Sequence, residues 1–202
     1  MRGVTFLICS LLFCCGAFSQ AQDKPAEKPV APQMSPTSGA RLEFLDEVSY
    51  FEQRYERLAD AIPAEKYSWR PSATEGVRNI GEVYMHVVIA NYSYAKLLGT
   101  PYPAGLDPKA LVASSNDKTK VLQALKDSFA HMRNAILAVK DSELDKEIKT
   151  PRGQTTIRGA FIMFTGSYGE HLGQSISYAR SIGVVPPWTE ERQRQEGDKS
   201  KP

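Results

Sequence analysis

The side chains of this 202-residue chain that could do chemistry gather in one segment, between Phe164 and Tyr178. If the segment is a helix, its polar residues recur at spacings of three or four and continue one apolar face. Leaving an imidazole, hydroxyl or amide unpaired on a buried face costs about 1 to 3 kcal/mol per group. The pattern therefore predicts a metal, a ligand or a hydrogen-bond network beside this face. The face comprises Ile157, Phe161, Phe164, Ser167, His171, Gln174 and Tyr178.

Two of the three histidines are predicted to point inward from different helices. His171 lies on the face just described, and His86 borders the apolar face of an earlier helix. His131 falls on a boundary stripe and is expected to touch solvent. Neutral imidazoles from separate helices of a bundle are a common way to bind Zn, Ni, Cu or Fe, although a lone inward histidine is more often a core residue.

Four amphipathic segments must position these groups, and no alternation typical of strands competes with them. The first runs from Leu42 to Ile62, before Pro63. The second starts at Asn79, with Glu82 completing a capping box, and ends near Gly99. The third begins at residue 116 or 117 and continues to 139, and the fourth runs from 155 or 156 to 183. We expect an all-α four-helix bundle, with connections long enough for either simple or crossover winding.

Glycines recur every seven residues in the fourth segment, at Gly159, Gly166 and Gly173. Each costs a helix about 0.5 to 1 kcal/mol relative to alanine, so the stripe calls for a reason. We expect that it lets a neighbouring helix or loop approach closely, or that it opens a cavity beside His171.

The two ends of the chain are predicted to lie outside the folded domain, and the N-terminal end predicts export. Residues 1–21 are typical of a cleaved signal peptide, with cleavage after Ser19 or Ala21, so the protein is expected in a periplasm or outside the cell. Residues 22–39 are rich in Pro and Ala and are expected to form a disordered linker. The bundle is assigned to residues 40–188, and residues 189–202 to a charged disordered tail.

Composition excludes several classes of function. All three cysteines lie in the predicted signal, so the mature domain has no thiol for catalysis. With 25 Lys and Arg against 23 Asp and Glu, no strong field favours nucleic acid, and no stable membrane anchor is expected. A small-molecule ligand and a second copy of the chain stay open as partners.

The domain resembles the DinB-like family, which is described together with bacillithiol transferases and mycothiol-dependent isomerases. The resemblance rests on Trp69-Arg-Pro and Gly76-Val-Arg-Asn-Ile-Gly-Glu leading to His86, and on Glu170-His-Leu-Gly-Gln through Tyr178-Ala-Arg to Gly183-Val-Val-Pro-Pro. It implies a four-helix bundle. It also implies a divalent metal, with Zn or Ni expected first, bound by one histidine of the second helix and a His-x-x-x-His pair of the fourth.

His86 and His171 match the first and last of these ligands, but Ser167 occupies the position of the middle one. A neutral hydroxyl is a poor ligand for Zn or Ni, so affinity should fall unless Glu82, Glu170 or His131 substitutes. Gln174 and Tyr178 would line the pocket.

Two hypotheses follow from this departure. The domain is a binding protein with a degenerate metal site, in which the metal is bound weakly or not at all, or it is a divalent-metal-dependent hydrolase or transferase that uses His86 and His171. Low-molecular-weight thiols are cytoplasmic reagents, so export makes hydrolysis the better of the two reactions.

Overall fold

The computed structural model describes residues 39–199, and these form a four-helix bundle with short additions. The prediction of an all-α bundle is confirmed. The long helices are α1 (Gly39–Ala61), α2 (Ile80–Leu97), α4 (Lys118–Ala138) and α5 (Ile157–Ser181). The shorter elements are η1 (Ala64–Lys66), α3 (Pro108–Ala113), η2 (Asp141–Glu143), β1 (Glu147–Thr150), β2 (Gly153–Thr156) and α6 (Pro187–Lys199).

Local capping signals fix where three of the long helices begin. The Asn79 side chain accepts a hydrogen bond from the Glu82 amide while the Glu82 carboxylate accepts one from the Asn79 amide, each at 2.7 Å. This is the predicted capping box, which satisfies amides that have no partner inside the helix. Asp117 caps α4 and Thr156 caps α5 in the simpler way.

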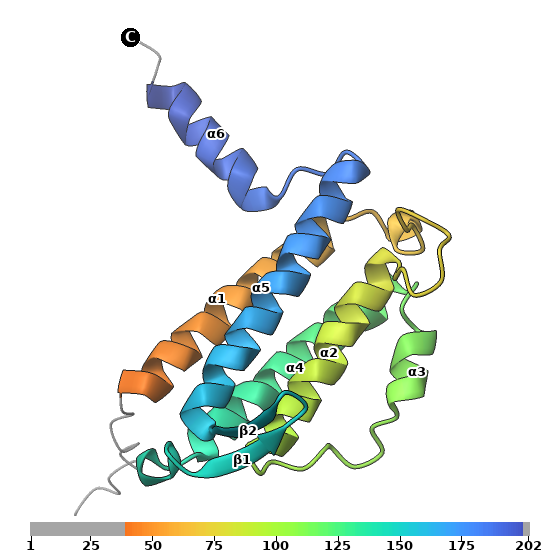
Figure 1. The fold of residues 1–202 in the computed structure, drawn as a ribbon. Coiled ribbons are helices and arrows are strands. Elements are labelled where there is room, and N and C mark those ends of the chain that lie inside the picture. The colour runs from red at the N-terminus through yellow and green to blue at the C-terminus, as the bar shows by residue number, and fades with distance from the viewer. Residues whose placement is uncertain (1–38, 200–202) are drawn as a thin grey trace, which may run out of the picture. The chain divides into compact units, whose positions relative to one another are not determined.

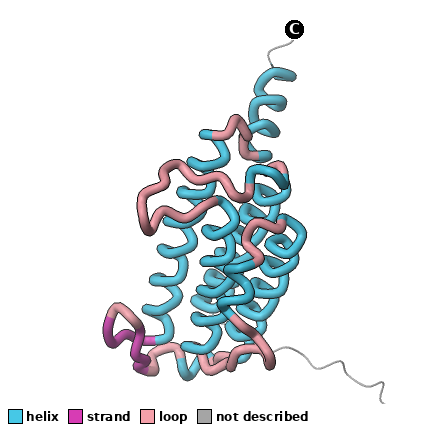
Figure 2. Tube along the Cα trace, turned by 90° about the vertical axis from the view of Figure 1, so that its right-hand side faces the viewer, coloured by secondary structure: helices cyan, strands magenta, loops and turns pink. Residues whose placement is uncertain are grey.

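The winding of the bundle is a crossover arrangement. Helix α1 packs against α4 and α5, and α2 packs against the same two helices, so α1 and α2 lie on a diagonal (Figure 1). The loop of residues 62–79 makes the first diagonal connection, and the segment of residues 139–156 makes the second. The tube view shows the second connection at one end of the bundle, with its strands in magenta (Figure 2).

The β1–β2 hairpin, α3 and α6 depart from the prediction. Residues 147–156 form an antiparallel hairpin, β1–β2, although no strand was expected there. Four-residue strands are too short to show an alternating pattern. Helix α3 interrupts the connection from α2 to α4. The prediction of a disordered tail from residue 189 is wrong as far as Lys199, because the chain continues as α6, with Arg57 of α1 paired to Glu191.

The core is unusually aromatic and places Tyr55, Tyr84, Phe129 and Tyr168 at its centre, all essentially inaccessible to solvent. Two stacked ring pairs extend it, Phe44 on Phe161 at 4.3 Å and Tyr94 on Phe164 at 4.0 Å between ring centroids. Leu42, with which the first predicted amphipathic segment begins, lies outside this core and is 46 % exposed.

A chain of buried hydrogen bonds joins the four long helices. The Tyr55 hydroxyl donates to the Tyr168 carbonyl, and the Tyr168 hydroxyl donates to Asn91 Oδ1, both at 2.7 Å. Asn91 Nδ2 then donates to Ser128 Oγ at 3.1 Å. Because each of these groups has a partner, the chain avoids the cost of unpaired polar groups in the interior. Burial raises the pKa of the Tyr55 and Tyr168 phenols, so both stay neutral.

The predicted signal peptide of residues 1–21 lies outside the described residues, as does the predicted linker apart from Gly39, which begins α1. Among the described helices, none has the length and apolar character needed to cross a membrane.

Candidate functional site

His86 of α2 and His171 of α5 meet on one side of the bundle. Their ring centroids lie 4.6 Å apart with an interplanar angle of 79°, so one ring faces the edge of the other. Both side chains are half-buried. The two rings are therefore direct neighbours, although they come from positions 85 residues apart in the sequence.

The face that carries His171 is less buried than its sequence pattern predicts. Ser167, His171, Gln174 and Tyr178 are all half-buried and form the border of the packed face. The predicted face is buried as far as Phe164. Beyond it, α5 buries the residues one position further along the chain, which are Tyr168, Leu172, Ser175 and Ala179. Leu172 and Tyr168 are better packing groups than His171 and Ser167, so the helix rotates to bury them. The polar groups are consequently free to meet a ligand.

A relay of side chains orients His171. Its Nδ1 lies 3.3 Å from Gln174 Oε1, and Gln174 Nε2 donates to the Tyr178 hydroxyl at 3.1 Å. Because an amide oxygen can only accept, this contact favours the tautomer in which Nδ1 carries the proton and Nε2 carries the lone pair. Tyr178 is in turn held edge-on by Trp69 at 5.6 Å between ring centroids. Gln174 and Tyr178 thus act on the position of His171.

The surroundings of His86 keep its imidazole neutral. Burial lowers the pKa of His86 to about 4, with further contributions from the positive charge of Arg78 and from His171. A ring that is neutral at pH 7 keeps a lone pair that can bind a metal or accept a proton.

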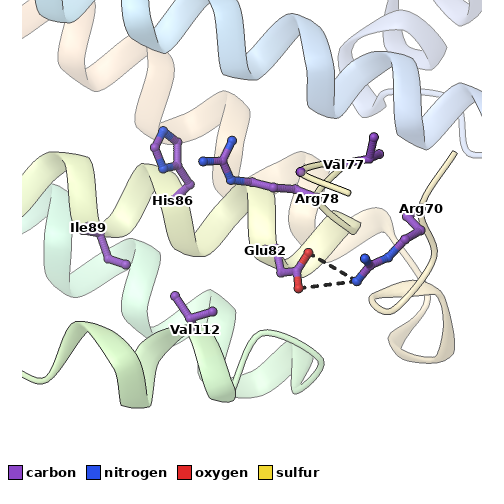
Figure 3. Close-up of a pocket in the computed structure, with 8 residues that line it drawn as sticks. Arg70, Val77, Arg78, Glu82, His86, Ile89 and Val112 are labelled. Atoms are coloured by element: carbon purple, nitrogen blue, oxygen red, sulfur yellow. Dashed lines mark hydrogen bonds and ion pairs between the residues drawn. The ribbon is translucent and has the colours of Figure 1, made fainter. Parts of the chain in front are cut away.

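A cleft of about 420 Å³ opens beside His86. Its walls come from the loop before α2, from α2 itself and from α3, and Figure 3 shows the Arg78 guanidinium beside the His86 ring. Its lining residues are Arg70, Gly76, Val77, Arg78, Glu82, His86, Ile89 and Val112. Arg78 belongs to the motif that leads to His86, but no place beside the His86 ring was predicted for it, because it lies in a loop without periodicity.

The first turn of α2 is locked to the loop that forms one wall of the cleft. The Ile80 and Gly81 amides donate to the Trp69 and Tyr67 carbonyls, each at 3.0 Å. A Cβ atom at Gly81 would stand 1.7 Å from the Ser115 carbonyl oxygen, so only glycine fits there. The two hydrogen bonds fix the loop before α2, and the Gly81 contact fixes the segment after α3, relative to the helix that carries His86.

The remaining candidate ligands lie in different settings. Ser167 is one turn before His171 on the same side of α5. Both carboxylate oxygens of Glu82 are 3.4 Å from Arg70, and one also accepts from the Asn79 amide, so the Glu82 carboxylate points toward Arg70 and away from His86 in Figure 3. Glu170 is exposed. Within residues 39–199, no group of three or more His, Cys, Asp or Glu side chains could hold a metal ion.

His131 and the glycine stripe both lie apart from this pair. The His131 ring packs 5.2 Å from the Tyr92 ring. The expectation of a close helix approach fails at Gly166 and Gly173, because a Cβ atom at either would meet nothing within 4 Å. At Gly159 the near neighbour is the Thr155 hydroxyl of the preceding strand. Neither Gly166 nor Gly173 lines the cleft beside His86.

Comparison with known proteins identifies the family. Residues 47–175 match the family described as the DinB superfamily, which is more than half of the chain, and the chain belongs to that superfamily. Among curated proteins, no match was found.

Two solved structures share the fold. A DinB-like protein from Bacillus cereus superposes with a TM-score of 0.61 at 15 % identity, over 71 % of this chain and 93 % of its own. YfiT from Bacillus subtilis, described as a probable metal-dependent hydrolase with an unusual four-helix bundle topology, gives 0.56 at 14 % identity, over 77 % and 95 %. At such identities the likeness concerns the fold alone.

Proposed function

We propose that this protein is a small-molecule binding member of the DinB superfamily with a degenerate metal site. His86 and His171 hold a divalent ion, with Zn or Ni expected first, and the adjoining cleft takes the ligand. The observation that carries the proposal is the 4.6 Å contact between two imidazoles from α2 and α5, with Ser167 at the third position.

The residues present fit a weakly held ion. Two neutral imidazoles are good ligands for Zn and Ni, and the Gln174 contact leaves Nε2 of His171 available. Ser167 adds only a neutral hydroxyl, so two protein ligands bind less tightly than the three that catalytic zinc sites use. A divalent ion with open positions would supply Lewis acidity and a more acidic bound water.

Metal titration of the purified protein tests the pair. We expect one equivalent of Zn or Ni to bind, and the His86→Ala and His171→Ala variants to lose at least about 10-fold in affinity. His131→Ala is the matched control and should bind like the parent protein. Binding below about a tenth of an equivalent, unchanged by either variant, would overturn the metal part of the proposal.

Ser167→His tests whether one ligand is all that is missing. If the three positions converge, the variant should gain about 10-fold or more in affinity for Zn or Ni, measured by competition with a chelating dye. Gly166→His, one residue away on the exposed side of α5, is the control and should gain nothing. Equal gains in the two variants would show that the position of Ser167 has no special relation to the pair.

Hydrolysis is the second candidate function. It is supported by the meeting of the two histidines and by the shared fold of YfiT, which is described as a probable metal-dependent hydrolase. A panel of ester and amide substrates with added Zn or Ni tests it. Turnover that disappears in His171→Ala would favour the enzyme, whereas metal binding without turnover on the panel would favour the binding protein.

We also propose that the chain is exported by a cleaved signal within residues 1–21 and acts in a periplasm or outside the cell. The support is the sequence pattern of Arg2 followed by an apolar stretch and small residues. N-terminal sequencing of the processed protein tests this, and a retained Met1 would contradict it.

A further inference from the structure

The cleft beside His86 carries a positive charge that the described protein does not neutralise. It is lined by two arginines and one glutamate. Arg70 lies 3.4 Å from Glu82, so these two charges offset each other. Arg78 has no hydrogen-bond or ion-pair partner among residues 39–199. Because its guanidinium stands beside the His86 ring, an anion bound to it would lie next to the histidine pair (Figure 3).

The opposite part of the cleft is apolar. Ile89 of α2 and Val112 of α3 face each other there, whereas Val77 lies on the side of Arg78. Val112 is 44 % exposed, so much of its apolar surface is in contact with water. A bound molecule with an apolar part would cover these groups and gain about 25 cal/mol for each Å² removed from water.

We propose that the cleft binds a small amphipathic carboxylate. Its carboxylate pairs with Arg78, which suits the planar, two-pronged geometry of a guanidinium, and its apolar part covers Val112 and Ile89. The volume of about 420 Å³ lies within the usual range for sites that take small organic molecules. This inference deepens the proposed function, because it names the class of ligand that would meet the histidine pair.

Binding of a matched pair of probes to the purified protein tests the proposal. The probes are 3-phenylpropionate and its neutral analogue 3-phenylpropanamide, which share the apolar part and differ in the charge. Calorimetry at fixed salt, with chelator present, should show the carboxylate binding about 10-fold more tightly than the amide. In Arg78→Gln this preference should disappear. Arg152→Gln removes the same charge at the distant hairpin turn and should retain it.

Three results would overturn the proposal. These are equal affinity for the two probes in the parent protein, the same loss in Arg152→Gln as in Arg78→Gln, and inorganic phosphate binding as tightly as 3-phenylpropionate. The last would show that the cleft recognises charge without an apolar part. Because chelator is present, an Arg78-dependent preference supports this inference even if metal titration fails. Metal binding without that preference would support the proposed metal site and contradict the proposal that the cleft binds an amphipathic carboxylate.

Discussion

Two polar clusters connect α2 and α5, and they differ in how completely their groups are paired. In the interior, the Tyr168 hydroxyl, Asn91 and Ser128 form a continuous chain of hydrogen bonds away from solvent. At the border, His86 and His171 contact each other through their rings, and each ring keeps a nitrogen without a protein partner in the described residues.

The fully paired cluster is suited to stabilising the fold, and the incompletely paired cluster is suited to binding a ligand. A closed network in a low-dielectric interior is costly to break and cannot accept a ligand without losing a bond. Unpaired polar groups in a half-open cluster cost little free energy, because solvent can reach them. Their free lone pairs can bind a ligand. The expectation that the polar residues of the fourth helix need a buried partner therefore applies to Tyr168, while His171 and Gln174 lie where a ligand can reach them.

The largest expected effect comes from breaking the closed cluster. Asn91→Leu should lower the free energy of unfolding by about 2 kcal/mol or more, because it leaves the Tyr168 hydroxyl buried without its acceptor and removes a donor to Ser128. Urea denaturation measures this. Gln174→Leu, the same change in the half-open cluster, should cost less than about 0.5 kcal/mol. Equal losses would show that the two clusters do not differ as described.

A smaller effect is expected when pH is changed. The pKa of His86 is lowered to about 4 in the folded protein, against an ordinary value of 6.5. Between these values the unfolded chain binds a proton at His86 that the folded chain does not, so stability falls as pH drops from 6.5 to 4. After allowance for solvent screening at this half-buried site, the share of His86 should be about 1 kcal/mol.

Denaturation of metal-free protein at pH 7 and pH 4.5, compared with His86→Gln, isolates this share. The variant should lose less stability than the parent over that interval. An equal or greater loss in His86→Gln would contradict the assigned shift of the pKa.

The smallest effect concerns the open outer side of α5. Gly166→Ala should raise the free energy of unfolding by about 0.5 to 1 kcal/mol, because an added Cβ meets nothing within 4 Å and alanine favours a helix. Thermal denaturation at two protein concentrations measures it. A concentration-dependent loss of stability would show instead that a second copy of the chain covers this side.

The sequence predicted the long helices well because their signals are local. The reciprocal bonds of Asn79 and Glu82 and the cap at Thr156 involve residues three positions apart, so a short window contains all the information. The hairpin before α5 was missed because four-residue strands carry no period, and α6 because a helix without a buried face looks like a charged linker.

The candidate site could be predicted only in part. The spacing of apolar residues along the helices predicted that His86 and His171 point inward. The same spacing predicted that His171 is buried, whereas the structure leaves it half-buried. Which side of α5 is buried depends on competition between neighbouring side chains, and the packing of Tyr168 and Leu172 against other helices decides it. Arg78 was part of the motif that leads to His86, but its place beside the His86 ring was not predicted, because the neighbours of a loop residue are set by tertiary contacts.

The sequence by itself therefore determined the helical periods, the caps and the set of polar groups, since these follow from interactions within a few residues. Tertiary structure alone decided the crossover winding, the 4.6 Å meeting of His86 with His171 and the free charge of Arg78 beside them. The reason is that each of these depends on how side chains from distant helices and loops fill one shared volume.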